Sequence, residues 1–211
     1  MPSANTKNHR KTHTIRVVFS EYDKSSRGLG MERLHGFEIE SRHWYTDEDG
    51  KRLFRIDRYR NAAGEKELNT VYALNLDASY HARRNPERGT KRRERRRVLY
   101  RLPKVLAAIK RGATVWLCEG EKDAEALETL GIVATTAPYG ARHWAPEYTA
   151  QLRGADLVLV ADDDEPGWQR VEMLKKELDV ASLRIVKAAE GKDASDHIAA
   201  GYGLADFQEV A

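Results

Sequence analysis

The sequence contains a single cysteine, Cys118, among its 211 residues. One cysteine excludes an intramolecular disulfide framework and a zinc site built from several cysteines. It also favours a reducing compartment, and we expect the cytoplasm. No apolar run approaches the length needed to span a bilayer, so we expect no membrane association. The first residues are polar and basic without the apolar core of a secretory signal, and we interpret residues 1–13 as a disordered basic tail.

The length and composition allow one folded core, or a core domain with a smaller companion. A chain of 211 residues, 41% hydrophobic and 33% charged, can bury such a core. The pattern of the sequence changes near residue 98. We therefore divide the chain into a β-rich basic subdomain with an arginine-rich loop over residues 14–97 and an α/β domain over residues 98–211.

The β-rich part shows the alternation that is typical of strands. Strands are predicted at 14–19, 36–40 and 69–75, and the segment 42–60 is predicted to form a hairpin. The turn of this hairpin is Asp49-Gly50, because Asp-Gly suits the tight turns that connect antiparallel strands.

Basic residues gather at the end of this part. Between Arg83 and Arg101 there are ten lysines and arginines against two glutamates. Such a run is either a solubilising loop or a contact for a polyanion, and the imbalance favours nucleic acid. The residues expected to contact nucleic acid or nucleotide are Arg83, Arg84, Arg92, Arg93, Arg95, Arg96, Arg97 and Arg101, together with Lys122 and Lys192 beside acidic turns.

The second part alternates helices and strands at short spacing. Helices are predicted at 98–111, 121–131, 145–154, 165–179 and 193–201, and strands at 114–118, 132–137, 156–161 and 182–188. This order predicts an α/β fold with a doubly wound, mainly parallel sheet, preceded by the small β-rich basic subdomain.

Acidic residues follow the predicted strands of this sheet. Glu119 ends strand 114–118, and Asp162, Asp163 and Asp164 end strand 156–161. Because ligands of open α/β sheets bind beyond the carboxyl ends of the strands, we expect Glu119 to face Asp162 and Asp164 across a cleft, with Asp163 pointing away. Oxygen ligands without histidine or cysteine suit Mg²⁺ (or Mn²⁺).

A third acidic turn and two helix starts complete the pattern. Asp193 and Asp196 follow strand 182–188 and are further candidate metal ligands. Asp123 and Glu165 open predicted helices, where a carboxylate is expected for capping alone.

The order of these motifs resembles the Toprim domain of DnaG-type primases, topoisomerases and OLD-family nucleases. The matching stretches are EGEKDAEAL, APYGA, ADDDEPG and GKDASD, which span residues 114 to about 202. In that family a glutamate and an Asp-x-Asp pair hold the catalytic metal, and Glu119, Asp162 and Asp164 stand at those positions. The segment VLYRLPKVLAAIKRG before them resembles the junction that precedes Toprim in DnaG-type primases, and residues 44–76 are similar to the small β-rich basic segment before Toprim in phage and plasmid primases.

The resemblance implies a DNA primase core that makes short RNA primers with a divalent metal. Glu119, Asp162 and Asp164 would be catalytic, and the partners would be a single-stranded DNA template and ribonucleoside triphosphates. The sequence contains no zinc ribbon and no nucleotide-binding P-loop, and it ends soon after the Toprim motifs. We therefore expect a replicative helicase, or a separate zinc-binding or helical primase module, as a further partner. The alternatives are a Toprim nuclease acting on DNA and a non-catalytic nucleic-acid-binding module.

Overall fold

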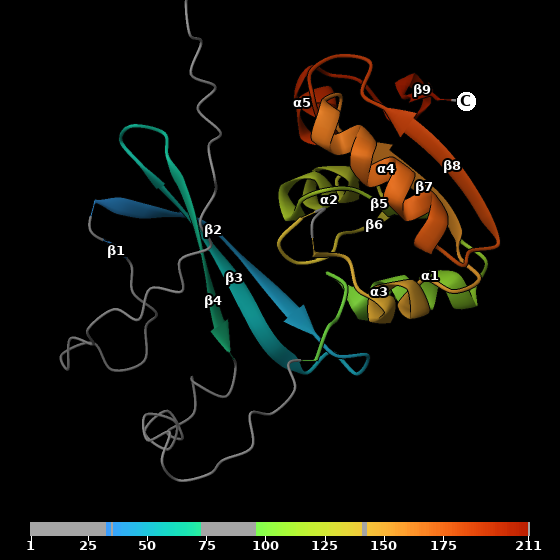
Figure 1. Ribbon diagram of the computed structural model, residues 1–211, viewed down its shortest axis with the longest axis horizontal. Helices are drawn as coiled ribbons and strands as arrows, with labels where there is room; N and C mark the ends of the chain where they lie inside the picture. Colours follow the sequence, from blue (N-terminus) through green and yellow to red (C-terminus); the bar gives the residue numbers. More distant parts are fainter. Residues whose placement is uncertain (1–32, 35, 73–95, 141–142, 211) are drawn as a thin grey trace, which may run out of the picture.

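The computed structural model describes residues 33–34, 36–72, 96–140 and 143–210, and it contains two sheets side by side (Figure 1). The predicted tail 1–13, the predicted strand 14–19 and most of the arginine-rich loop lie outside the described residues. Within the described part, no helix is long and apolar enough to cross a membrane.

The N-terminal sheet is antiparallel with the order β1-β2-β3-β4. Its strands are β1 (Arg33–Leu34), β2 (Phe37–Thr46), β3 (Arg52–Asn61) and β4 (Lys66–Tyr72). The predicted hairpin turn is confirmed: Gly50 has a φ of 82°, and the Asp47 carboxylate accepts a hydrogen bond from the Lys51 amide at 2.8 Å. The predicted separation of a strand at 36–40 from the hairpin is wrong, because β2 continues through a bulge between Ile39 and Ser41.

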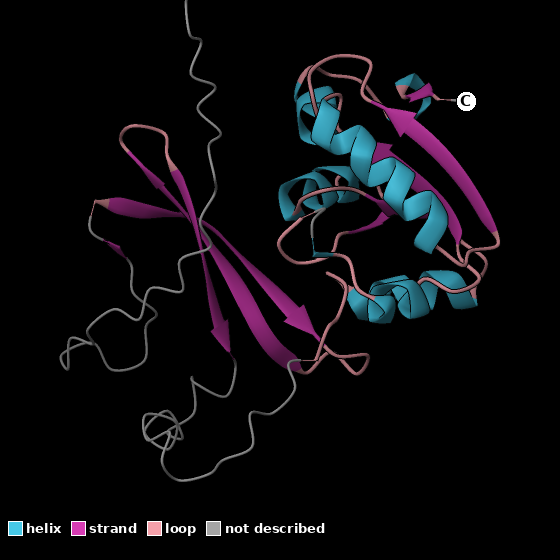
Figure 2. Ribbon diagram, viewed as in Figure 1, coloured by secondary structure: helices cyan, strands magenta, loops and turns pink. Residues whose placement is uncertain are grey.

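The C-terminal sheet has the order β6-β5-β7-β8-β9, in which β9 alone is antiparallel to its neighbour (Figure 2). Its strands are β5 (Val115–Leu117), β6 (Val133–Thr135), β7 (Asp156–Ala161), β8 (Ser182–Lys187) and β9 (Gln208–Glu209). The helices are α1 (Leu102–Lys110), α2 (Glu121–Glu128), α3 (Pro146–Gln151), α4 (Glu165–Glu177) and α5 (Ala194–Ala199), followed by the 3₁₀ turn η5 (Leu204–Asp206). The expected mainly parallel α/β sheet is confirmed.

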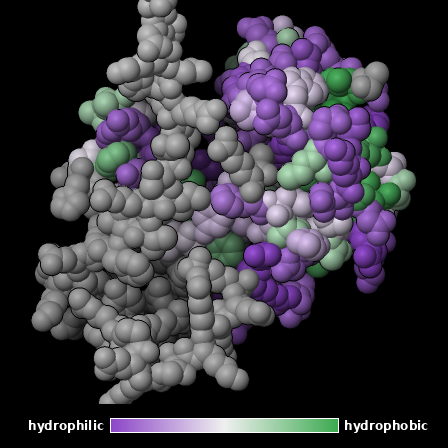
Figure 3. All heavy atoms as spheres, viewed as in Figure 1, coloured by the Kyte–Doolittle hydropathy of each residue, from purple (hydrophilic) through white to green (hydrophobic). Residues whose placement is uncertain are grey.

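Helices cover both faces of this sheet, and the alternation along β7 shows how. Leu157 and Leu159 are buried in the same cluster as Tyr148 of α3 and Leu174 of α4. The intervening Val158 joins the cluster that contains the buried residues of α2 and α5. Successive side chains of a strand point to opposite faces, so the continuous apolar run of β7 is the expected sequence of a strand covered on both sides. Polar residues dominate the outer surface of this part in the view of Figure 3.

The two sheets share a core. Tyr45 and Ile56 of the N-terminal sheet belong to the same buried cluster as Tyr100 and Trp116. The Tyr45 and Phe54 rings stack with their centroids 4.7 Å apart. The N-terminal sheet is therefore packed directly on the α/β part, next to the start of α2.

Candidate active site

The carboxyl end of β5 forms a tight turn that carries Glu119. The Cys118 amide donates to the Thr135 carbonyl at 3.0 Å, and the Thr136 hydroxyl donates to the carbonyl of Glu119 at 2.8 Å. Both bonds come from the neighbouring strand β6 or its end. The turn then enters α2 at Gly120, so the backbone on both sides of Glu119 is fixed.

Asp162 stands at the end of the adjacent strand β7, as expected. β5 and β7 pair in parallel with Leu117 opposite Leu159, so both strands deliver their acidic residues to one edge. Asp162 is 8% exposed. Burial, followed by the charges of Glu119 and Asp123, raises the pKa of Asp162 to about 7. At this edge of the sheet, burial and the neighbouring carboxylates therefore make ionisation of Asp162 less favourable than in water.

The turn after Asp162 is closely packed. A methyl group at Gly167 would lie 2.3 Å from the carbonyl oxygen of Asp162, so only glycine fits there. Asp164 is the N-cap of α4 and accepts a hydrogen bond from the Gly167 amide at 2.8 Å. Burial raises the pKa of Asp164, but its bonds to Lys192 and Gly167 outweigh this effect and the net pKa is lowered.

Lys192 joins the two acids that the sequence predicts as ligands. Its ammonium lies 2.9 Å from Asp164 and 3.5 Å from Asp162. Asp163 is exposed and pairs instead with Lys187 of β8 at 3.0 Å. The expected division of the run, in which Asp162 and Asp164 share a side and Asp163 points away, agrees with these contacts.

The third acidic turn is held together mainly by its own carboxylates. Asp193 is the N-cap of α5 and accepts hydrogen bonds from the Asp196 amide at 2.8 Å and the Ser195 hydroxyl at 2.7 Å. Asp196 accepts from the Lys192 amide at 3.1 Å. These bonds shape the loop that carries Lys192. A metal-binding role of Asp193 and Asp196 stays a prediction.

Asp123 does more than cap a helix. Its carboxylate accepts from the Gly120 amide at 3.2 Å, as a capping residue does, and also from the Ser195 amide of α5 at 3.2 Å. Burial and the nearby Asp193 raise its pKa to about 6. It is therefore a buried member of the same carboxylate group.

Two arginines that the sequence interpretation missed lie beside these acids. Arg58 of β3 donates to Glu121 at 2.5 Å, and Glu121 also accepts from the Tyr45 hydroxyl at 2.8 Å. Arg170 of α4 is 4% exposed and donates to the Cys118 carbonyl at 2.7 Å. Arg170 lies on the buried face of α4. The signal for it in the sequence was a charged residue on the helix face that packs into the core.

Most of the described basic residues that were expected to contact nucleic acid are engaged in ion pairs. Arg96 pairs with Glu48 at 2.5 Å and Arg97 with Glu147 at 3.2 Å. Arg101 lies 3.2 Å from Glu128 and stacks over the Tyr100 ring. Lys122 is exposed on α2. The remaining predicted contacts, Arg83, Arg84, Arg92, Arg93 and Arg95, lie outside the described residues.

The carboxylate edge fits a hard divalent cation in its chemistry. No three histidine, cysteine, aspartate or glutamate side chains of the described residues form a complete metal-binding group. Mg²⁺, however, is commonly held by one or two carboxylates together with substrate phosphates. Glu119 and Asp162 supply such a pair, and a cationic group, the Lys192 ammonium, already lies against Asp162 and Asp164.

Comparison with known sequences gives a partial relative. No family model matches the chain. A curated protein of Mycobacterium phage D29, the gene 57 protein, is 32% identical over 94 residues, which is 44% of this chain and 60% of that protein. The chain therefore spans less than two thirds of this relative.

Solved primase cores share the architecture. A DNA primase domain from Pseudomonas aeruginosa aligns with a TM-score of 0.54 at 16% identity over 84% of this chain and 53% of that one. The E. coli primase catalytic core gives 0.54 at 12% over 84% and 54%. The RNA polymerase domain of Mycobacterium tuberculosis DnaG, solved with double-stranded DNA, gives 0.54 at 17% over 85% and 56%. The chain has the fold of DnaG-type primase catalytic cores and spans about half the length of these neighbours.

Proposed function

We propose that the chain is a Toprim-type primase core that joins ribonucleotides on a single-stranded DNA template with Mg²⁺ or Mn²⁺. The observation that carries this proposal is the pairing of Glu119 and Asp162 at the ends of adjacent parallel strands, close enough for Glu119 to raise the pKa of Asp162. The fold shared with primase cores supports the same reaction class.

Glu119 and Asp162 would hold the metal, with Asp164 as a further ligand. The metal would neutralise phosphate charge and lower the pKa of the attacking 3′-hydroxyl. Other residues of the chain position these ligands. The bonds from the ends of β6 and from α4 orient the Glu119 turn, and Gly167 lets α4 start directly against Asp162. An ionised Asp162 is required for metal binding, so activity at limiting metal should fall below about pH 7.

Binding of template and triphosphates falls to the basic residues. Arg96 and Arg97 are about half exposed, and their acidic partners, Glu48 and Glu147, are equally exposed. Exposed ion pairs contribute little stability, so phosphate groups can replace these carboxylates at low cost. Lys192 is also half exposed and can move from Asp162 and Asp164 to a phosphate when the metal enters. A helicase or a further primase module would complete the assembly.

The test is incorporation of labelled ribonucleotides on mixed single-stranded DNA templates with Mg²⁺ or Mn²⁺. We expect short template-dependent products from the wild type, and none from Glu119→Gln, while template binding by this variant persists. Cleavage of the supplied DNA in place of synthesis would establish a nuclease. Template binding by the wild type without either reaction would establish a non-catalytic module.

A further inference from the structure

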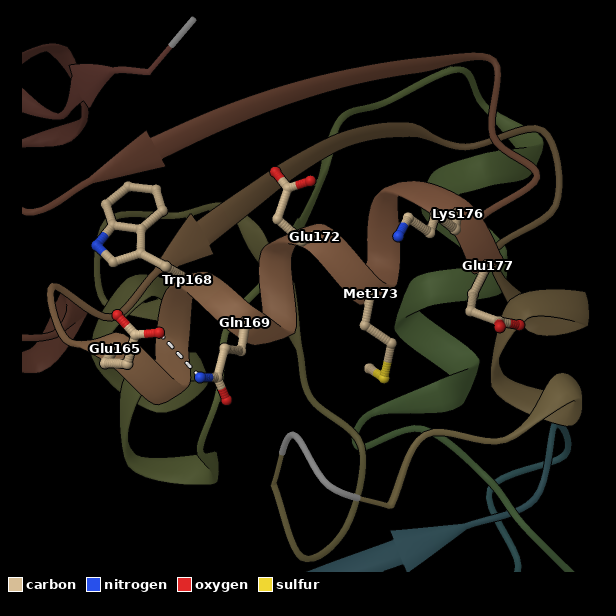
Figure 4. Close-up of a pocket in the computed structure, with 7 residues that line it drawn as sticks. All are labelled: Glu165, Trp168, Gln169, Glu172, Met173, Lys176 and Glu177. Atoms are coloured by element: carbon tan, nitrogen blue, oxygen red, sulfur yellow. Dashed lines mark hydrogen bonds between the residues drawn. The ribbon is translucent and has the colours of Figure 1, made fainter.

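Helix α4 begins at the acidic turn that contains Asp162 and Asp164, and through Arg170 it also contacts the turn that carries Glu119. Its N-cap is Asp164, and its first turn lies against the backbone of Asp162 through Gly167. One turn further along, Arg170 points inward and reaches the end of β5. The opposite face of α4 carries Gln169, Glu172 and Lys176 (Figure 4). The inward arginine therefore belongs to the site side of the helix.

Arg170 is fixed by burial and by one close contact. Its side chain is almost fully enclosed, and its Nη2 donates to the carbonyl of Cys118 at 2.7 Å. Cys118 directly precedes Glu119. The guanidinium thus holds the backbone of the turn that carries one predicted metal ligand, from behind the carboxylate edge.

The charge of Arg170 is compensated by the acids of the site. Burial lowers the pKa of Arg170, whereas Glu119, Asp162 and Asp123 raise it. A buried arginine without acidic neighbours would be strongly destabilising, and so would three neighbouring carboxylates without a cation. Each therefore compensates the other in the metal-free protein.

We infer that Arg170, buried against the turn that carries Glu119, is the internal counter-ion of the carboxylate edge and thereby limits how tightly Glu119 and Asp162 hold a divalent cation. The inference rests on the proposed function, because it requires the metal site at these acids. The permanent positive charge of Arg170 offsets the mutual repulsion of the carboxylates. The same charge repels a divalent cation that approaches these carboxylates. Arginine suits the position because it remains charged when buried.

The test is Mn²⁺ binding measured by isothermal titration calorimetry at about pH 8.5 and constant ionic strength. This pH lies above the pKa of Asp162, so proton competition is small. Arg170→Gln removes the charge and keeps a polar side chain, and we expect its Mn²⁺ dissociation constant to fall at least about fivefold. Arg170→Lys keeps the charge and should stay within about twofold of the wild type. Lys176→Gln removes an exposed charge from the outer face of the same helix and should also stay within about twofold.

The direction of the change separates a counter-ion from a merely structural residue. Loss of structural support weakens metal binding or leaves it unchanged, so an unchanged or weaker affinity in folded Arg170→Gln would overturn the inference. If Arg170→Gln does not fold, Arg170→Lys decides: a change in affinity above about fivefold in that charged variant would equally overturn it. If the wild type binds Mn²⁺ but the Arg170 variants do not show the expected affinities, the counter-ion role of Arg170 is refuted and the metal site is not. A wild type without saturable binding refutes the metal site, and the inference with it.

Discussion

Asp162 is predicted to destabilise the metal-free protein, and Asp162→Asn should therefore be more stable than the wild type. The physical reason is the raised pKa of this carboxyl, which burial and the charges of Glu119 and Asp123 bring to about 7 from the ordinary 3.8. A carboxyl that ionises less readily in the folded state than in the unfolded state lowers stability at high pH.

The magnitude follows from the two pKa values. The difference between about 7 and 3.8 corresponds to at most about 4 kcal/mol of destabilisation above pH 7. Solvent at this edge of the sheet and the nearby Lys192 screen the charge, and we expect about 2 kcal/mol. The sign of the pH dependence is definite. The destabilisation is complete above the folded pKa, diminishes as the pH falls through 7, and is nearly gone near the unfolded pKa of 3.8.

Urea unfolding of metal-free protein between about pH 8 and pH 4 measures this effect. Asp162→Asn should gain stability at the upper end and lose this advantage toward the lower end. Asp163→Asn is the matched control, because the Asp163 carboxylate is exposed and paired with Lys187. This variant should gain no stability at pH 8. If Asp162→Asn is less stable than the wild type at pH 8, or if its advantage does not depend on pH, the assigned electrostatics are wrong.

Three further substitutions probe the packing around the site. Gly167→Ala places a methyl group 2.3 Å from the Asp162 carbonyl and should cost about 2–3 kcal/mol in chemical denaturation; a neutral result would show that the turn can relax. Tyr45→Phe removes the hydroxyl that donates to buried Glu121 at 2.8 Å and should cost about 1–2 kcal/mol. An unchanged denaturation midpoint would mean that this link between the two sheets contributes nothing. His197→Ala removes a fully buried ring stacked on Phe207 and should lower the free energy of unfolding by about 2 kcal/mol or more, which corresponds to a drop of several degrees in melting temperature. An unchanged melting temperature would contradict this packing role.

The sequence predicted those parts of the fold that local pattern determines. The apolar run of β7 and the acids after it predicted a buried strand and a carboxylate edge, since strand burial and parallel order leave few other arrangements. The alternation of Asp162, Asp163 and Asp164 predicted that Asp162 and Asp164 share a side, which agrees with their contacts to Lys192, whereas Asp163 pairs with Lys187.

Other features depend on contacts that no local pattern contains. The helix predicted at 98–111 begins only at Leu102, because Arg101 has a φ of 57° and Val98, Leu99 and Tyr100 are buried in the core before it. β9 has two residues and no apolar alternation, and it is held by backbone pairing with β8.

The missed site residues have the same explanation. Arg170 contacts Cys118, which is 52 residues away, and Arg58 contacts Glu121 at a separation of 63. Only the folded chain brings these pairs together. The charge of Arg170 on a buried helix face was visible in the sequence, but its partner was not.

The most direct test of the central claim compares ribonucleotide incorporation by the wild type, Asp162→Asn and Asp163→Asn on single-stranded DNA with Mn²⁺. The two variants change neighbouring carboxylates by the same chemistry, but Glu119 raises the pKa of Asp162, whereas Asp163 is exposed and pairs with Lys187. We expect Asp163→Asn to retain activity close to that of the wild type and Asp162→Asn to lose at least about a hundredfold, since a metal ligand contributes several kcal/mol to the transition state. A folded Asp162→Asn protein that works within about fivefold of the wild type would contradict the claim that this carboxylate edge carries the chemistry.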